Sequence, residues 1–131
     1  MLFFVFPASL PAADLEITVE GVRNAKGTVR LVLHDKPEKF PRGKATAHLD
    51  LAARKGTVRG VLSGLAAGTY GLSLLHDEND NGRMDSNFIG LPKEGYGFSN
   101  DARATLGPPS FAAAAFTVGP GRTAITVHGV Y

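Results

Sequence analysis

The residues with the clearest potential for chemistry lie in segment 76–100, which is rich in oxygen-bearing side chains, glycines and aromatics. Side-chain oxygens recur around Gly82 at largely alternate positions, on Asp77, Asn79, Asn81 and Asp85. Alternate side chains of a tightly curled loop converge on one point, and calcium takes about six to eight oxygen ligands. The pattern predicts a calcium-binding loop over residues 77–85, in which Arg83 contributes its backbone carbonyl.

A solvated turn is the competing interpretation of this loop. Asn81-Gly82 is a favoured hairpin-turn pair, and Asp and Asn are common in turns for reasons unrelated to metals. In an EF-hand register, Phe88 stands where the bidentate glutamate belongs. Against the solvated turn, four acidic residues crowd together with Arg83 as the only nearby cation, and such crowding favours a counter-ion. Both interpretations stay open.

Two His-Asp pairs, at residues 34–35 and 76–77, each end an apolar segment. If the two segments are neighbouring strands, His34 and His76 can meet, and a histidine pair near carboxylates can bind zinc or transfer protons. The alternative is that each histidine satisfies backbone groups at its strand end. A metal-dependent or hydrolytic enzyme would use the loop carboxylates with His34 or His76. No nucleophile elbow, dinucleotide fingerprint or P-loop is present, so we favour a non-catalytic role.

An aromatic stretch follows the acidic loop, with Phe88, Tyr96, Phe98 and Phe111 separated by glycines. These rings can line a groove for a ligand, or they can plug an open end of the fold as a satellite core, which is the interpretation we favour. In the first case the candidate ligand surface comprises Tyr96 and Phe98 with the two histidines, His34 and His76.

The rest of the chain alternates apolar and polar residues, which is typical of antiparallel sheets with one buried face. Glycine-rich turns separate the alternating segments, which cover residues 14–20, 28–34, 45–51, 57–62, 68–76, 114–118 and 123–130. About seven short strands with one long loop predict a single all-β, antiparallel β-sandwich of Greek-key type, immunoglobulin-like or transthyretin-like. The inward residues by alternation are Leu31, Leu33, Leu72, Leu74 and Val127. Residues 110–113 can form one short helical turn.

Composition is that of one globular domain, which we place at residues 14–131 of the 131. The formal net charge of +2 is too small to indicate nucleic-acid binding, and no run of residues is long and apolar enough for a membrane span. Residues 1–13 combine a short apolar run with a small, proline-containing spacer, and predict a shortened signal peptide. An edge strand is the alternative, which the two prolines disfavour. We therefore expect an exported protein, periplasmic or extracellular.

A family resemblance is carried by residues 74–82, 85, 87–100, 107–111 and Phe116, including the run NFIGLPKEGYGFSN. This pattern resembles the bacterial family catalogued as domain of unknown function 2141. The resemblance implies an exported single-domain protein with an all-β fold, and it implies no activity or ligand residues. The expected function is an exported β-sandwich binding or structural module, stiffened by calcium at residues 77–85, with a protein or glycan partner outside the cytoplasm.

Overall fold

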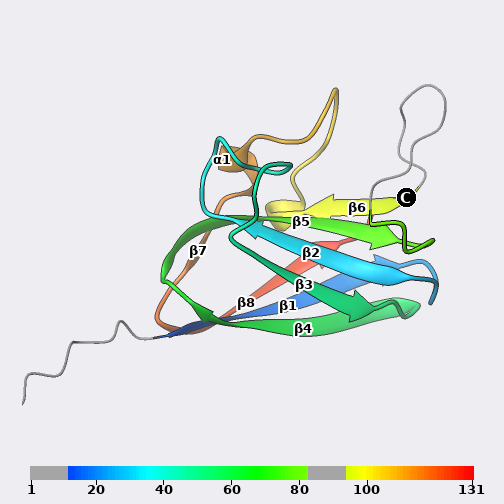
Figure 1. Ribbon diagram of the computed structural model, residues 1–131, viewed down its shortest axis with the longest axis horizontal. Coiled ribbons are helices and arrows are strands. Elements are labelled where there is room, and N and C mark those ends of the chain that lie inside the picture. The colour runs from blue at the N-terminus through cyan, green and yellow to red at the C-terminus, as the bar shows by residue number, and fades with distance from the viewer. Residues whose placement is uncertain (1–11, 83–93) are drawn as a thin grey trace, which may run out of the picture.

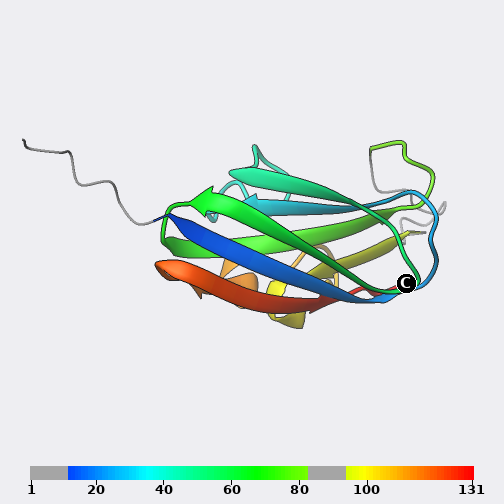
Figure 2. The same cartoon turned by 90° about the horizontal axis from the view of Figure 1, so that it is seen from below.

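The computed structural model describes residues 12–82 and 94–131, which form two facing β-sheets (Figures 1 and 2). The strands are β1 (Ala13–Val22), β2 (Thr28–His34), β3 (Ala47–Ala52), β4 (Gly56–Leu65), β5 (Gly68–Asp77), β6 (Gly95–Phe98), β7 (Phe116–Val118) and β8 (Gly121–His128). Two short helical segments, η1 (Ser99–Asp101) and α1 (Phe111–Ala114), follow β6. Within these ranges, no helix has the length and apolar character needed to cross a bilayer.

The smaller sheet has the order β4-β1-β8, and the larger has the order β3-β2-β5-β6, with β7 paired to β5. The predicted all-β sandwich is confirmed. Its pairs are antiparallel except β1–β8, which runs in parallel register from Ala13 opposite Gly121 to Glu20 opposite His128. A parallel pair needs a long connection between its strands. Here β1 and β8 are separated by nearly the whole domain, so that condition is met.

The core lies between the sheets and follows from the alternation of each strand. Because successive side chains point to opposite faces, every second residue is buried in β2, in β1 from Ala13 to Val19 and in β5 from Tyr70 to His76. Leu31, Leu33, Leu72, Leu74 and Val127 are all buried, which confirms the predicted inward face. Leu31 lies opposite Leu74, and Leu33 lies opposite Leu72, in the β2–β5 pair.

A second cluster covers the outer face of the larger sheet. Phe40, from the β2–β3 connection, packs edge-on against Phe98, Phe111 and the ring of His34, with centroid separations of 6.1, 5.8 and 5.9 Å. Gly71 makes room for it, since a Cβ there would lie 3.0 Å from the Phe40 ring. Phe98 and Phe111 thus form a satellite core, but on a sheet face and not at an open end of the sandwich.

The region between β5 and β7 departs most from the sequence expectation. β6 lies within the segment expected to be one long loop. The short helical turn expected near residues 110–113 is present as α1, and the Ser110 hydroxyl caps it by accepting from the backbone N–H of Ala113 at 3.2 Å. Residues 83–93 of the same segment lie outside the described residues.

Candidate functional site

Asp77 ends β5 and organises the start of the acidic loop. Its side chain is fully buried. Oδ2 accepts from the backbone N–H of Gly82 at 2.7 Å and from Nε of Arg30 at 2.9 Å, and Oδ1 accepts from the N–H of Asn81 at 3.2 Å. Burial alone would raise the pKa of Asp77, but these hydrogen bonds outweigh it and hold the pKa below its ordinary value. The carboxylate therefore stays ionised while buried.

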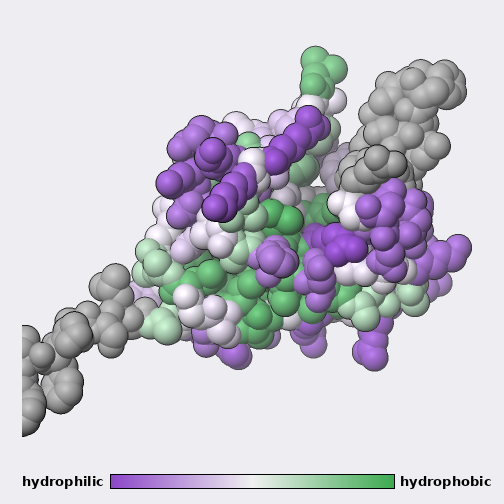
Figure 3. All heavy atoms as spheres, in the orientation of Figure 1, coloured by the Kyte–Doolittle hydropathy of each residue, from purple (hydrophilic) through white to green (hydrophobic). Residues whose placement is uncertain are grey.

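Arg30 supplies the counter-charge for this end of the molecule. Besides Asp77, its guanidinium bonds to Asp50 at 2.8 Å and lies 3.8 Å from Asp80. Asp80 also accepts from the Thr28 hydroxyl at 2.6 Å. Figure 3 shows hydrophilic side chains gathered at the end of the sandwich where β5 runs into this loop.

Glu78 has its own partners from the β1–β2 connection. Arg23 forms an ion pair with it, and the amide of Asn24 donates to it at 2.7 Å. Burial raises the pKa of Glu78, but the hydrogen bonds from Asn24 and Arg23 lower it by a larger amount. The net shift of this pKa is therefore downward. The backbone N–H of Glu78 donates to the buried carboxylate of Glu94 at 2.7 Å. Asp77, Glu78 and Asp80 therefore have cationic partners in Arg23 and Arg30, which weakens the argument from crowding for a bound cation.

The predicted calcium ligands are thus placed only in part. Asp77, Asn79 and Asn81 lie on the described part of the loop, and Oδ1 of Asn79 accepts from the N–H of Asn81 at 3.3 Å. Arg83 and Asp85 lie outside the described residues. Across residues 12–82 and 94–131, no three His, Asp or Glu side chains are grouped so that they could hold a metal ion. Calcium binding stays a prediction.

The two histidines do not meet. Their strands are neighbours, as the hypothesis required, but the pairing is antiparallel: His34 lies opposite Gly71, and His76 lies opposite Val29. The two histidines are five residue positions apart along the paired strands, which is about 17 Å. Both side chains are buried, so neither belongs to an exposed ligand surface. This corrects the proposed pair and removes His34 and His76 from the candidate surface.

His76 is a structural residue. Its Nε2 lies 2.7 Å from the carbonyl oxygen of Lys26, which can only accept, so Nε2 carries the proton. In the neutral imidazole Nδ1 then accepts from the hydroxyl of Tyr131 at 2.6 Å, and this hydroxyl accepts from the backbone N–H of Arg23 at 3.1 Å. The expectation that such a histidine satisfies backbone groups holds for His76, and for His34, whose Nε2 lies 3.0 Å from the carbonyl of Gly43.

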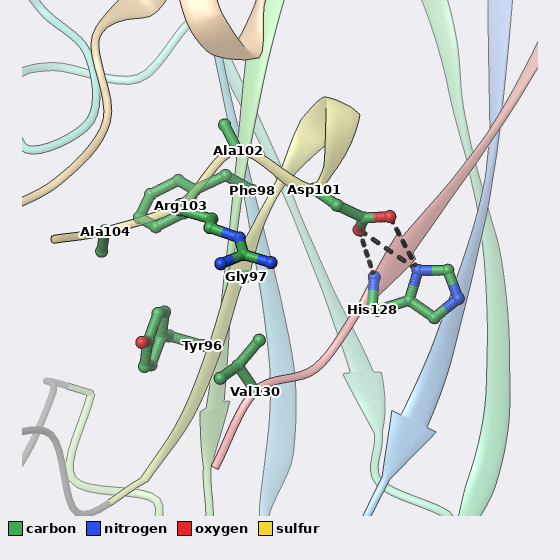
Figure 4. A pocket seen from close by; sticks show the side chains of 9 residues that line it. All are labelled: Tyr96, Gly97, Phe98, Asp101, Ala102, Arg103, Ala104, His128 and Val130. Atoms are coloured by element: carbon green, nitrogen blue, oxygen red, sulfur yellow. Dashed lines mark hydrogen bonds and ion pairs between the residues drawn. The ribbon is translucent and has the colours of Figure 1, made fainter.

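A groove lies between β6, η1 and the end of β8 (Figure 4). Its volume is about 500 Å³. Aromatic, cationic and acidic side chains share its wall, which is formed by Tyr96, Gly97, Phe98, Asp101, Ala102, Arg103, Ala104, His128 and Val130. Two candidate surface residues, Tyr96 and Phe98, therefore lie at this groove.

A carboxylate and an imidazole close one side of the groove. Asp101 accepts from the backbone N–H of His128 at 3.1 Å, and its Oδ2 lies 3.0 Å from Nδ1 of the same residue. Glu20, on β1, lies 3.1 Å from Nε2. The side-chain hydrogen bond to Asp101 is the main cause of the raised pKa of His128, and Glu20 adds to it. His128 therefore joins β1, η1 and β8, with one ring nitrogen directed to Asp101 and the other to Glu20.

The turn that carries Asp101 is fixed by its own backbone and by the residues before it. Asn100 and Asp101 both have positive φ, at 61° and 49°, a conformation that Asn and Asp tolerate better than most residues. The amide of Asn100 donates to the carbonyls of Ala113 and Ala115 at 3.2 and 2.7 Å. Ser99 is buried; its hydroxyl accepts from the N–H of Leu72 at 2.9 Å and donates to Ala114. This turn holds β5, α1 and β8 together.

Sequence reasoning found the two aromatic residues of the groove but missed Asp101, Arg103 and His128. The available signal was local: Asn100-Asp101, which follows Phe98 and Ser99, is a pair suited to left-handed backbone. Alternation predicts only a solvent-facing strand position for His128, and its side chain is indeed about half exposed, at 52%. The parallel β1–β8 pairing is what brings Glu20 to its ring.

Comparison with known proteins gives one relationship. No curated protein and no solved structure matches the chain significantly. The family model described as "uncharacterized protein conserved in bacteria", domain of unknown function 2141, matches residues 17–126. This match spans both sheets, the η1 turn and most of the groove. The chain therefore belongs to the bacterial family of domain of unknown function 2141.

Proposed function

We propose that the protein is an exported binding module whose ligand site is the groove between β6, η1 and β8. The observation that carries this proposal is the groove's composition: two aromatic residues, Tyr96 and Phe98, beside the guanidinium of Arg103. Ligand sites combine apolar and aromatic walls with a few placed polar groups. The η1 turn supports the proposal further, because its hydrogen bonds to α1 and β8 hold the groove wall in a fixed form.

Nuclear magnetic resonance tests this proposal even though the natural ligand is unidentified. A library of small soluble fragments is added to ¹⁵N-labelled protein, and backbone shift changes are mapped onto the fold. Binding to the groove would move the amides of residues 96–98, 101–104 and 128–130 together. Hits that cluster elsewhere, or a library in which no fragment shifts these amides, would overturn the assignment of the groove as the ligand site.

Export is supported by the apolar residues 2–6 and the small-residue spacer that follows them. N-terminal sequencing of protein recovered from the periplasm or medium of a bacterial host, after expression with its own start, should begin near Asp14. Intact chains beginning at Met1 and confined to the cytoplasm would contradict it.

Calcium stiffening of loop 77–85 is a separate proposal, supported by the oxygen-bearing side chains of Asn79 and Asn81 beside Gly82. Asp77 is already bonded to Arg30 and two backbone N–H groups, so a cation there must compete with these donors. Calcium should raise the melting temperature more than magnesium does, and Asn79→Ala should remove the difference. Unchanged melting curves at millimolar calcium would leave the solvated turn. The buried Asp77 is unsuitable for this test, because its removal perturbs the fold itself.

The enzyme alternative has no specific observation in its favour. It pairs the loop carboxylates with His34 or His76. His34 lies at the opposite end of the sheet, and both ring nitrogens of His76 are bonded to Lys26 and Tyr131. His128 at the groove has each ring nitrogen directed to a carboxylate.

A further inference from the structure

We propose that the groove binds an oxyanion attached to a flat, apolar group, with Arg103 holding the anion and Tyr96 contacting the flat group. This inference rests on the proposed function and names the ligand class of the same site. Carboxylates and phosphates share the required chemistry, since either presents two oxygens to the planar fork of a guanidinium.

The first step of the argument is the state of Arg103. It is exposed, and it makes no hydrogen bond or ion pair with any residue in the described part of the chain. Figure 4 shows its side chain extending across the groove, between Phe98 and Tyr96. Arg30, in contrast, bonds to Asp77 and Asp50. Arg103 is therefore a cation at a hollow with its donors available.

The second step concerns the carboxylate nearest to it in the groove wall. Asp101 could in principle neutralise Arg103, but both of its oxygens are directed to His128: Oδ1 to the backbone N–H at 3.1 Å, and Oδ2 to Nδ1 at 3.0 Å. The left-handed backbone of Asn100 and Asp101 fixes this direction. Because Asp101 is directed to His128, it leaves the guanidinium of Arg103 without a carboxylate partner in the groove wall, which suits an anionic ligand.

The third step concerns the aromatic part of the wall. Tyr96 is fixed by a two-way backbone bridge to Val130, with N···O distances of 2.9 and 2.7 Å. Phe98 packs behind it at 6.3 Å between ring centroids and is itself held by Phe40. The Tyr96 ring is thus supported on one side and only partly buried, so a flat apolar group can contact its remaining surface.

Four soluble probes separate charge from shape: benzoate and phenyl phosphate carry the anion, benzamide is neutral, and benzylamine is cationic. Titrations followed by ¹⁵N shifts give the site and the dissociation constant together. We expect at least one anionic probe to bind at residues 96–104 and 128–130, about tenfold more tightly than benzamide, with no binding of benzylamine. Added salt should weaken anion binding. The stronger of the two anions identifies carboxylate or phosphate as the source.

Arg103→Gln should lower the affinity for the anionic probe by about tenfold and leave that for benzamide unchanged. The matched control is Arg59→Gln, which removes an exposed arginine from β4, on the far edge of the smaller sheet, and should change neither. Equal affinity for benzoate, phenyl phosphate and benzamide at the groove, or an unchanged anion affinity in Arg103→Gln, would overturn the oxyanion inference and leave the groove as a binding site. Binding of all probes away from the groove, or no binding, would overturn both.

Discussion

Replacing Asp77 with asparagine tests the buried ion pair at the end of β5. Asp77→Asn keeps the shape of the side chain but removes its charge, and it turns an amide N–H₂ toward the N–H donors of Arg30 or Gly82. Breaking a buried pair costs about 3–5 kcal/mol when the remaining charge is stranded. Arg30 is not stranded, because it is partly exposed, with a side-chain exposure of 27%, and keeps Asp50 at 2.8 Å. The destabilisation then comes from the lost charge-assisted hydrogen bonds. We expect Asp77→Asn to lower the free energy of unfolding by about 2–4 kcal/mol.

Asp50→Asn is the matched control, since it removes a carboxylate from the same guanidinium at the surface, where Asp50 is 45% exposed. Such exposed pairs contribute about 0–1 kcal/mol. Urea denaturation followed by circular dichroism at neutral pH measures both. A cost for Asp77→Asn within about 0.5 kcal/mol of the Asp50→Asn cost would refute the assignment of Asp77 as a buried organiser of the loop.

The pH dependence of the same pair has a defined sign. The pKa of Asp77 is lowered in the folded protein, so its contribution to stability is complete above the unfolded value of about 3.9 and is lost as pH falls through the folded pKa. The difference in unfolding free energy between the wild-type protein and Asp77→Asn should therefore shrink in acid. A difference that stays constant down to the acid limit of folding would show that the charge is not the source of the effect.

Three further predictions concern the core, the η1 turn and the groove wall. Leu74→Ala should cost about 2–5 kcal/mol in chemical denaturation, because Leu74 is buried against β2; a loss below about 0.5 kcal/mol would contradict the register. Ser99→Ala should cost about 1–3 kcal/mol by leaving the buried N–H of Leu72 without its acceptor, and hydrogen exchange at Leu72 should accelerate; unchanged exchange would refute this bond. His128 has a raised pKa, so its ion pairs stabilise the fold fully below about pH 6.5, and this contribution disappears as pH rises through the folded pKa. At low pH the wild-type protein should therefore be slightly more stable than His128→Gln, by an amount typical of surface ion pairs, and this difference in unfolding free energy should disappear in base. A difference that grows with pH would contradict the His128 assignment.

The sandwich was predictable because each long strand carries its own alternation. In β1, β2 and β5 the inward side chains are mainly leucine, isoleucine and valine, so the pattern is visible in each strand taken alone. β6 was missed because its inward positions are Gly95 and Gly97. A Cβ at these positions would lie 2.3 Å from the Tyr131 ring and 2.5 Å from the carbonyl oxygen of His128. The close approach of the C-terminal segment thus removes the apolar side chains that would have marked the strand.

The arginine partners of the acidic loop were missed for a related reason. Counted along the chain, only Arg83 lies near the acidic residues, whereas in the fold Arg30 and Arg23 reach them from 47 and 55 residues away. The β2–β5 register places Thr28 opposite Asp77, which brings Arg30 to the same outer face. Such neighbours depend on strand pairing, which local sequence does not specify. The groove likewise could not be predicted from local sequence, because its residues come from β6, η1 and β8, which only the fold brings together.

A crystal structure of the protein soaked with phenyl phosphate tests the central claim most directly. The account predicts phenyl phosphate in the groove, with phosphate oxygens in hydrogen-bond contact with the Arg103 guanidinium and the phenyl ring against Tyr96, while Asp101 stays paired to His128. A groove left empty at saturating ligand, with phenyl phosphate bound at another surface or nowhere, would contradict it.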